Sequence, residues 1–173
     1  MRKLVEQNNP ILNSHANAVE IKNIGSESIQ TLIREMRAIL ESTEHGVALA
    51  APQVGEPLRL FIIRESVLDN GRGKREEGEK NYEPSDSVFI NPEITKISRR
   101  RVPLGEGCLS IPGIWGTVPR AEKVTINAIN ERGERVVRGA SGLLAHMFQH
   151  EVDHLNGILF TEMATEIRPD APQ

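Results

Sequence analysis

Side chains suited to chemistry are concentrated in residues 143–157, LLAHMFQHEVDHLNG. His150, Glu151 and His154 form the pattern H-E-x-x-H within this segment. Since a helix advances about 100° per residue, the two histidines would share one helical face and could bind one metal ion. The glutamate beside them could take a proton from a bound water, and this arrangement hydrolyses amides. The pattern therefore predicts a catalytic metal that needs a further ligand from elsewhere in the chain.

The alternative for this pattern is a charged helix with two surface or capped histidines. The apolar residues of the same helix argue for burial instead; they are Leu143, Leu144, Met147, Phe148 and Leu155. Histidines on a buried face need hydrogen-bond or metal partners. The composition of the helix therefore favours the metal site.

Cys108, the sole cysteine, is the candidate for the third ligand. A lone cysteine is usually a small buried hydrophobe. This one follows glycines at 105 and 107 and precedes Pro112, which indicates a segment whose backbone closely approaches another group. A thiolate with two imidazoles suits iron(II), zinc, cobalt or nickel, and leaves one position of a catalytic metal open.

Composition favours one globular domain over a nucleic-acid binder. The chain has 173 residues, of which 38% are hydrophobic and 26% charged, and its net charge is -3. This length can bury a sizeable core, and this charge implies no broad electropositive surface. The basic run 99–101 is read as a solvated segment.

One cysteine allows no intramolecular disulfide. The first residues, MRKLVEQNNPIL, have no apolar stretch typical of a signal peptide. No apolar run approaches the roughly 20 residues of a membrane span. We therefore expect a cytoplasmic protein without a membrane partner or a direct nucleic-acid partner, in which the thiol stays reduced.

Hydrophobic spacing predicts the elements that position these side chains. Apolar residues recur every three or four positions between Ile29 and Leu40, which indicates an amphipathic helix. Gly133 suits a hairpin turn and Gly157 a helix end. The expected elements are a helix over 26–44, strands over 60–63, 88–90 (ended by Asn91-Pro92) and 94–102, a hairpin of 123–130 with 134–138, and a helix over 141–156.

Two segments are expected to lie outside the core: an exposed loop over 69–86 and a polar, frayed tail over 161–173. No linker or internal repeat divides the chain. We expect a single α+β domain over 1–173, with mostly antiparallel sheets packed around the C-terminal H-E-x-x-H helix and an N-terminal amphipathic helix.

Three ordered motifs resemble those of the bacterial-type peptide deformylases. They are GVALAAPQ (46–53), EGCLS (106–110) and QHEVDHLNG (149–157), and the resemblance extends over about residues 9–160. It implies an enzyme that hydrolyses the N-formyl group of formyl-methionine on nascent polypeptides and releases formate. It also implies one divalent ion, typically Fe(II), with zinc, nickel or cobalt able to replace it.

The resemblance assigns roles to individual residues. The implied metal ligands are Cys108, His150 and His154. Glu151 would act as general base and then general acid, while Gln53 and the backbone N–H of Leu109 would form the oxyanion hole. The residues expected to bind substrate are Gly46, Val47, Ala48, Gly107, Leu143, His146 and Met147.

Three residues depart from the family pattern or vary within it. Ala48 replaces a glycine, so either its φ is ordinary or the substrate lies slightly differently; slower turnover is expected. His146 replaces an aliphatic residue and could be a pocket-lining polar group, a core histidine with a partner or a fourth ligand; the pocket role is preferred. Trp115 could flank the substrate cleft or cover the core edge.

Supporting ion pairs and competing functions complete the expectations. Arg120 is expected to pair with Asp153, and Glu106 to contact Arg120 or a metal ligand. A related deacylase or peptidase with altered first-residue preference is the alternative enzyme, although Glu162 and Glu166 match no third-ligand motif. A low-activity metal-binding relative is the other alternative. The acidic tail offers no basic docking helix for the ribosome, although ribosome proximity is compatible with the substrate.

Overall fold

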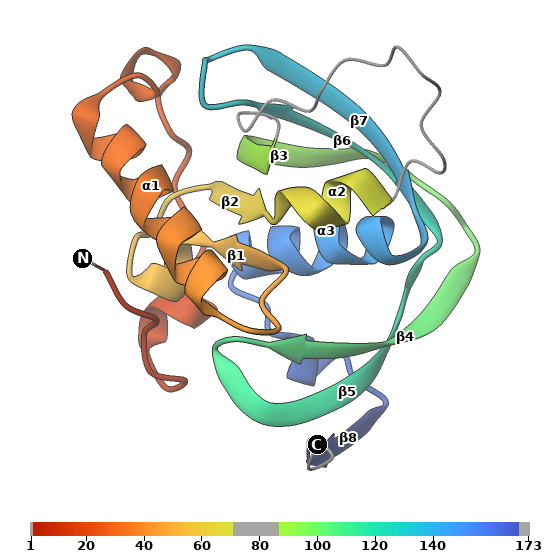
Figure 1. Ribbon diagram of the computed structural model, residues 1–173. Coiled ribbons are helices and arrows are strands. Elements are labelled where there is room, and N and C mark those ends of the chain that lie inside the picture. Colours follow the sequence, from red (N-terminus) through yellow and green to blue (C-terminus); the bar gives the residue numbers. More distant parts are fainter. Residues whose placement is uncertain (1, 71–86, 170–173) are drawn as a thin grey trace.

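The computed structural model describes residues 2–70 and 87–169, and its strands form two antiparallel sheets around a central helix, α3 (Gly142–Leu155) (Figure 1). The five-stranded sheet has the order β1-β2-β3-β6-β7 and the three-stranded sheet the order β4-β5-β8. The strands are β1 (Ala48–Ala50), β2 (Leu60–Ile63), β3 (Val88–Ile97), β4 (Arg101–Cys108), β5 (Ile111–Ala121), β6 (Lys123–Ile129), β7 (Arg135–Ser141) and β8 (Glu166–Pro169). Because α3 contacts strands of both sheets, the expected α+β architecture is confirmed.

Helix α1 (Glu27–Ser42) is the predicted N-terminal amphipathic helix. Ser26 caps it by accepting a hydrogen bond from the backbone N–H of Ile29. Its buried face, which includes Leu32, Ile33 and Met36, packs in the apolar cluster that also contains β2. The remaining helical elements are α2 (Glu65–Asn70) and the 3-10 turns η1 (Pro10–Asn13), η2 (Ile21–Asn23), η3 (Ala51–Val54) and η5 (Phe160–Glu162).

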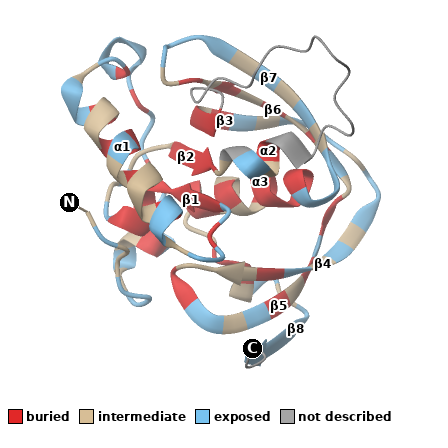
Figure 2. Cartoon of the chain, in the orientation of Figure 1, coloured by how far each residue is buried: buried red, intermediate tan, exposed pale blue. Residues whose placement is uncertain are grey.

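Three phenylalanines attach α3 to the five-stranded sheet. The rings of Phe61 and Phe89 stack with centroids 4.9 Å apart, and Phe148 meets Phe89 edge-on at 5.1 Å. All three side chains are fully buried, and the elements that carry them, β2, β3 and α3, contain buried segments, drawn red in Figure 2. Aromatic pairs in these geometries add to the free energy gained by burial. These ring contacts therefore fix the position and the rotation of α3 on the five-stranded sheet.

The structure contradicts the predicted strand boundaries around Asn91. Strand β3 continues through Asn91-Pro92 to Ile97, so the predicted end at this dipeptide is wrong, and 94–102 is divided between two sheets. Asn91 adopts a φ of 49°, and its side chain exchanges two 2.8 Å hydrogen bonds with the backbone of Val19. A register shift between Ile90 and Glu93 accommodates the proline as a β-bulge.

Two predicted irregular segments contain regular structure. Within the expected frayed tail, β8 pairs with β5 from Thr117↔Glu166 to Ile114↔Pro169. Its side chains are exposed, so backbone pairing rather than an apolar pattern holds this strand. Residues 69 and 70 end α2, and the rest of the expected loop, 71–86, lies outside the described residues.

The hairpin of β6 and β7 and the extent of α3 agree with the sequence prediction. Gly133 has a φ of 80° at the turn, and Gly157 has a φ of 73° just after α3. Both values are in the left-handed region that glycine tolerates best. Within residues 2–70 and 87–169, the helices are too short or too polar to span a membrane.

Replacing Gly157 tests how tightly the end of α3 is packed. An alanine Cβ there would lie 2.7 Å from the backbone carbon of Asn13, whereas a Cβ at Gly133 would have no atom within 4 Å. Both substitutions strain a left-handed backbone, at about 1–2 kcal/mol. Gly157→Ala should cost about 1–3 kcal/mol more through overpacking, measured by urea unfolding. Equal losses for Gly133→Ala and Gly157→Ala would contradict this packing.

Candidate active site

The structure brings Cys108, His150 and His154 together at the end of β4 and along one face of α3. Their candidate ligand atoms all lie within 4.8 Å of one another. Cys108 Sγ is 3.2 Å from His154 Nε2, and the two imidazole rings are 4.8 Å apart at their centroids. The helical spacing and the tip of β4 therefore place the three predicted ligands around one point.

The donor atoms fit a divalent metal ion. His150 Nδ1 contacts Glu106 Oε2 at 2.8 Å, which orients the ring and leaves Nε2 for a metal. Burial lowers the pKa of His154 well below its usual value, so this ring is the neutral form that binds metals. Burial opposes the charge on His150, but hydrogen bonds with Cys108 and Glu106 outweigh it and raise the pKa to about 10. Metal binding must therefore compete with a proton on His150.

Glu151 is a buried carboxylate beside this cluster. Its side chain is 3% exposed, and Oε2 is buried without a hydrogen-bond partner. Burial disfavours the charged form and raises the pKa of Glu151 to about 7. A carboxylate with this pKa can accept and return a proton near neutral pH.

Gln53 and Leu109 lie next to Cys108 and line one cavity. The Gln53 side chain in η3 accepts a 2.8 Å hydrogen bond from the N–H of Ala50, which fixes the direction of its amide. Its Nε2 donates to Ser110 Oγ at 3.1 Å and lies 3.4 Å from Cys108 Sγ. Leu109 directly follows Cys108 and lines the same cavity. The contact of Ser110 with Gln53 was not predicted from the sequence, although Ser110 lies within the EGCLS motif.

A cavity of about 620 Å³ opens onto this cluster. Residues of β1 and β4, which are edge strands of the two sheets, line it on two sides. All seven residues expected to bind substrate line it: Gly46, Val47, Ala48, Gly107, Leu143, His146 and Met147. Cys108, His150 and Glu151 also line it. The cavity therefore joins the predicted pocket to the predicted reaction centre.

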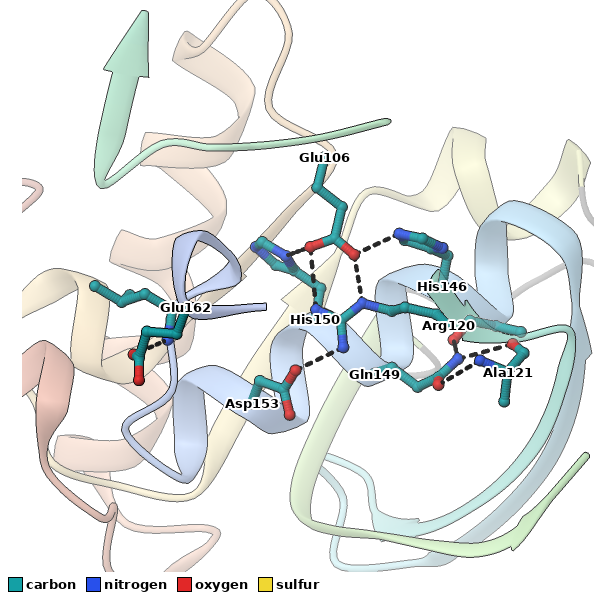
Figure 3. A network of polar contacts seen from close by, with 10 residues as sticks. Glu106, Arg120, Ala121, His146, Gln149, His150, Asp153 and Glu162 are labelled. Carbon is teal, nitrogen blue, oxygen red and sulfur yellow. Dashed lines mark hydrogen bonds and ion pairs between the residues drawn. The ribbon is translucent and has the colours of Figure 1, made fainter. Parts of the chain in front are cut away.

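Glu106 lines the cavity and is the centre of a buried polar network (Figure 3). Arg120 donates to both of its oxygens, with Nη2 at 3.0 Å, and donates from Nη1 to Asp153 at 2.6 Å. The expected Arg120–Asp153 pair and the contact from Glu106 to a ligand, His150, are thus confirmed. Burial would raise the pKa of Glu106, but its contacts with His146, His150 and Arg120 outweigh it and hold the pKa well below its usual range.

His146 combines two of the three expected roles. Its side chain lines the cavity, is almost fully buried, and places Nε2 against Glu106 in an ion-pair contact that lacks hydrogen-bond geometry. Among the described residues, the ligand cluster contains Cys108, His150 and His154 without it. His146 is therefore a buried residue with a partner and a wall of the pocket, and the fourth-ligand role has no support.

Ala48 has ordinary backbone angles. It pairs with Ile63 in β1, and Asn91 is the one non-glycine residue with positive φ in the described part of the chain. The first of the two alternatives for Ala48 therefore applies, and backbone strain gives no reason for slow turnover. The methyl group is nearly buried and lines the cavity.

Comparison with known proteins agrees with this geometry. The family model described as polypeptide deformylase matches residues 1–170. The chain belongs to this family. It is 43% identical to the peptide deformylase of Carboxydothermus hydrogenoformans over 165 residues, which cover 95% of this chain and 94% of the relative. Members of the family are metal-dependent hydrolases, which agrees with the Cys/His/His cluster.

A plant relative and a crystal structure extend the comparison. The chain is 39% identical to peptide deformylase 1B, chloroplastic, of Solanum lycopersicum, and the alignment covers 95% of this chain but 53% of the relative. The crystal structure of a peptide deformylase from Legionella pneumophila superposes with a TM-score of 0.77 at 37% identity, over 95% of this chain and 86% of that one. The family resemblance and the fold thus lead to the same assignment.

Substitution of Glu106 tests the buried network. Glu106→Gln removes a charge that faces Arg120 and orients His150, so metal affinity should fall about 10- to 100-fold and stability by about 3 kcal/mol. Metal titration and urea unfolding measure the two effects. The control is Glu134→Gln, which breaks an exposed ion pair with Arg132 and should leave metal affinity unchanged. Unchanged metal affinity in Glu106→Gln would contradict a role in orienting His150.

Proposed function

We propose that this chain hydrolyses the N-formyl group of formyl-methionine at the N-terminus of nascent polypeptides and releases formate. The observation that carries the proposal is the cluster of Cys108, His150 and His154, with Glu151 beside it, at a cavity between two free strand edges. Such edges bind extended chains by adding them as a strand. A peptide N-terminus can therefore lie along β1 or β4 and present its first amide to the cluster.

The proposed metal is one Fe(II) ion held by Cys108, His150 and His154, with zinc, nickel or cobalt as substitutes. This thiolate and imidazole set suits all four metals, and the family resemblance favours iron. When bound, the ion supplies Lewis acidity, which polarises a carbonyl group and acidifies water. Cys108 and His150 line the cavity, so a substrate in the cavity could reach an ion held by the three side chains.

Glu151 moves the proton in the proposed reaction. Its carboxylate accepts a proton from the attacking water and then donates it to the amine that leaves. The raised pKa of Glu151, about 7, favours both directions near neutral pH. A bound cation shifts this pKa downward, which keeps the base ionised before attack.

Gln53 and the backbone N–H of Leu109 are proposed to stabilise the oxyanion that forms on the formyl oxygen. The hydrogen bond from the N–H of Ala50 fixes the direction of the Gln53 amide, so its Nε2, which donates to Ser110 in this structure, faces the Cys108 side of the site. One such donor is typically worth about 2.7–4 kcal/mol. Crowding between the two strand edges would admit the formyl hydrogen and exclude larger acyl groups.

The first side chain of the substrate is proposed to enter the part of the cavity that α3 lines. Leu143, His146 and Met147 line this part of the cavity. A thioether chain suits the apolar members, while the imidazole adds one polar group. His146 therefore favours a second candidate function, a related deacylase with an altered first-residue preference.

The proposed cellular setting is the cytoplasm, close to the ribosome. A reducing compartment keeps the Cys108 thiol available as a ligand. The substrate is a peptide N-terminus newly formed by translation. We propose no direct contact with nucleic acid, since the net charge of -3 gives no general attraction to phosphate.

Replacing the proposed base tests the function directly. Glu151→Gln should lower the rate of formate release from formyl-Met-Ala-Ser about 100- to 10,000-fold, because it removes the proton acceptor. The enzyme is purified without oxygen, and its metal content is measured in parallel. Metal content should stay at that of the unmodified protein, since Glu151 is not among the clustered ligands.

The exposed Glu134→Gln substitution is again the control and should leave formate release unchanged. Absence of formate release from the unmodified, metal-loaded protein would refute the proposed function. Undiminished activity in Glu151→Gln would refute the role of this residue while leaving the function in place.

A second prediction concerns His146. If its imidazole lines the first-residue pocket, His146→Ile should raise the preference for formyl-Met over formyl-Gln peptides, because a polar wall becomes apolar. A difference of one methylene group in an apolar pocket changes the ratio of kcat/KM between two substrates about 10-fold or more. Ratios of kcat/KM for formyl-Met, formyl-norleucine and formyl-Gln peptides measure the change. Identical ratios in both proteins would exclude His146 from the pocket.

A further inference from the structure

Trp115, the sole tryptophan, lies at the mouth of the cavity on β5. Its side chain is 40% exposed, which is unusual for the largest apolar side chain of a folded chain. It belongs to none of the three apolar clusters of the described residues. Covering the core edge, the other role considered for it, therefore does not explain its position.

The indole lies across the two glycines of β4. A Cβ on Gly107 would come within 3.1 Å of Trp115 Cε2, and a Cβ on Gly105 within 3.5 Å of Cε3. In the sheet, Trp115 pairs with Gly107 on one side and with Arg168 of β8 on the other. Because Gly107 has no side chain, the ring can lie over β4 and is held there.

The register of the sheet places Trp115 on the outward face. Trp115, Gly105 and Gly107 share one face of the three-stranded sheet, while Glu106 lies on the opposite face, next to α3. An extended peptide added at the free edge of β4 alternates its side chains between these two faces. If its first side chain enters the pocket on α3, its second points to the outward face.

We propose that Trp115 determines specificity at the second residue of the substrate, by offering its ring to an aromatic side chain. This assignment rests on the proposed deformylation of extended peptides. Because the indole of Trp115 already lies against the two glycines of β4, it loses little conformational freedom when a substrate ring stacks on it. Stacking of this kind should favour phenylalanine over alanine by roughly 3- to 10-fold in kcat/KM.

The kinetic test uses formyl-Met-Xaa-Ser peptides with phenylalanine, leucine or alanine as Xaa. The unmodified protein should prefer phenylalanine, Trp115→Ala should reduce the preference to less than twofold, and Trp115→Phe should retain most of it. The control Val137→Ala truncates another exposed apolar residue, on β7, outside this cavity, and should leave the preference intact. An undiminished preference in Trp115→Ala overturns the proposal, as does a preference that follows the third residue in formyl-Met-Ala-Xaa peptides.

A binding test separates this proposal from the proposed function. Because Trp115 is the sole tryptophan, tryptophan fluorescence reports on this position directly. Titration of Glu151→Gln protein should give at least threefold tighter binding for formyl-Met-Phe-Ser than for formyl-Met-Ala-Ser, with a larger change in emission. A fluorescence response without formate release by the unmodified protein rejects deformylation and keeps the binding site. Formate release with equal binding of both peptides rejects the role of Trp115 alone.

Discussion

The buried carboxylate of Glu106 is the interaction on which the site depends. It lies on β4 and contacts Arg120 on β5 and two histidines on α3, while Arg120 also bonds Asp153 on the same helix (Figure 3). A lone charge at this depth would be strongly destabilising, so its partners must be held in place together. The three-stranded sheet and the helix are thus locked in the one relative position that brings Cys108 to the histidines.

The location of the cavity follows from how the apolar residues are divided. One cluster joins the aromatic face of α3 to the five-stranded sheet, and another joins Ile111 and Phe160 beneath the three-stranded sheet. The last turns of α3 pass between them and carry His150, Glu151 and His154. Because β8 covers one edge of β5 while β4 has no second neighbour in its sheet, β4 is the edge left open towards β1. The polar site and the open edges therefore coincide.

Local patterns predicted the parts of this structure that depend on local forces. The spacing of apolar residues predicted α1 and α3, and Gly133 predicted the hairpin. The sequence pattern did not predict that β3 continues through Asn91. Two hydrogen bonds between Asn91 and Val19, which is distant in sequence, hold a bulge there and keep the strand continuous. The pattern failed again for β8, whose exposed side chains have no apolar periodicity. Backbone groups pair this strand with β5, and one side-chain contact, from Thr117 to Glu166, adds to them.

The candidate site was predictable for a different reason. H-E-x-x-H restricts the chemistry, and a chain with one cysteine offers one thiolate, so the three clustered donors could be named from the sequence. The contact between His146 and Glu106 could not, because it depends on the packing of β4 against α3. The same holds for the ring of Trp115 over Gly107, which follows from the strand register.

The two buried glutamates of the site show how environment divides their tasks. Glu106 is surrounded by donors, so its pKa stays well below the usual range and its charge is fixed. Glu151 has an unpartnered oxygen in an equally buried position, and its pKa rises to about 7. Two carboxylates whose pKa values are driven apart can serve as fixed counter-charge and mobile proton carrier within one site. The guanidinium of Arg120 is permanently charged, so it keeps Glu106 ionised even when the neighbouring histidines are neutral. Glu106 and Glu151 could therefore exchange their roles only if Arg120 moved.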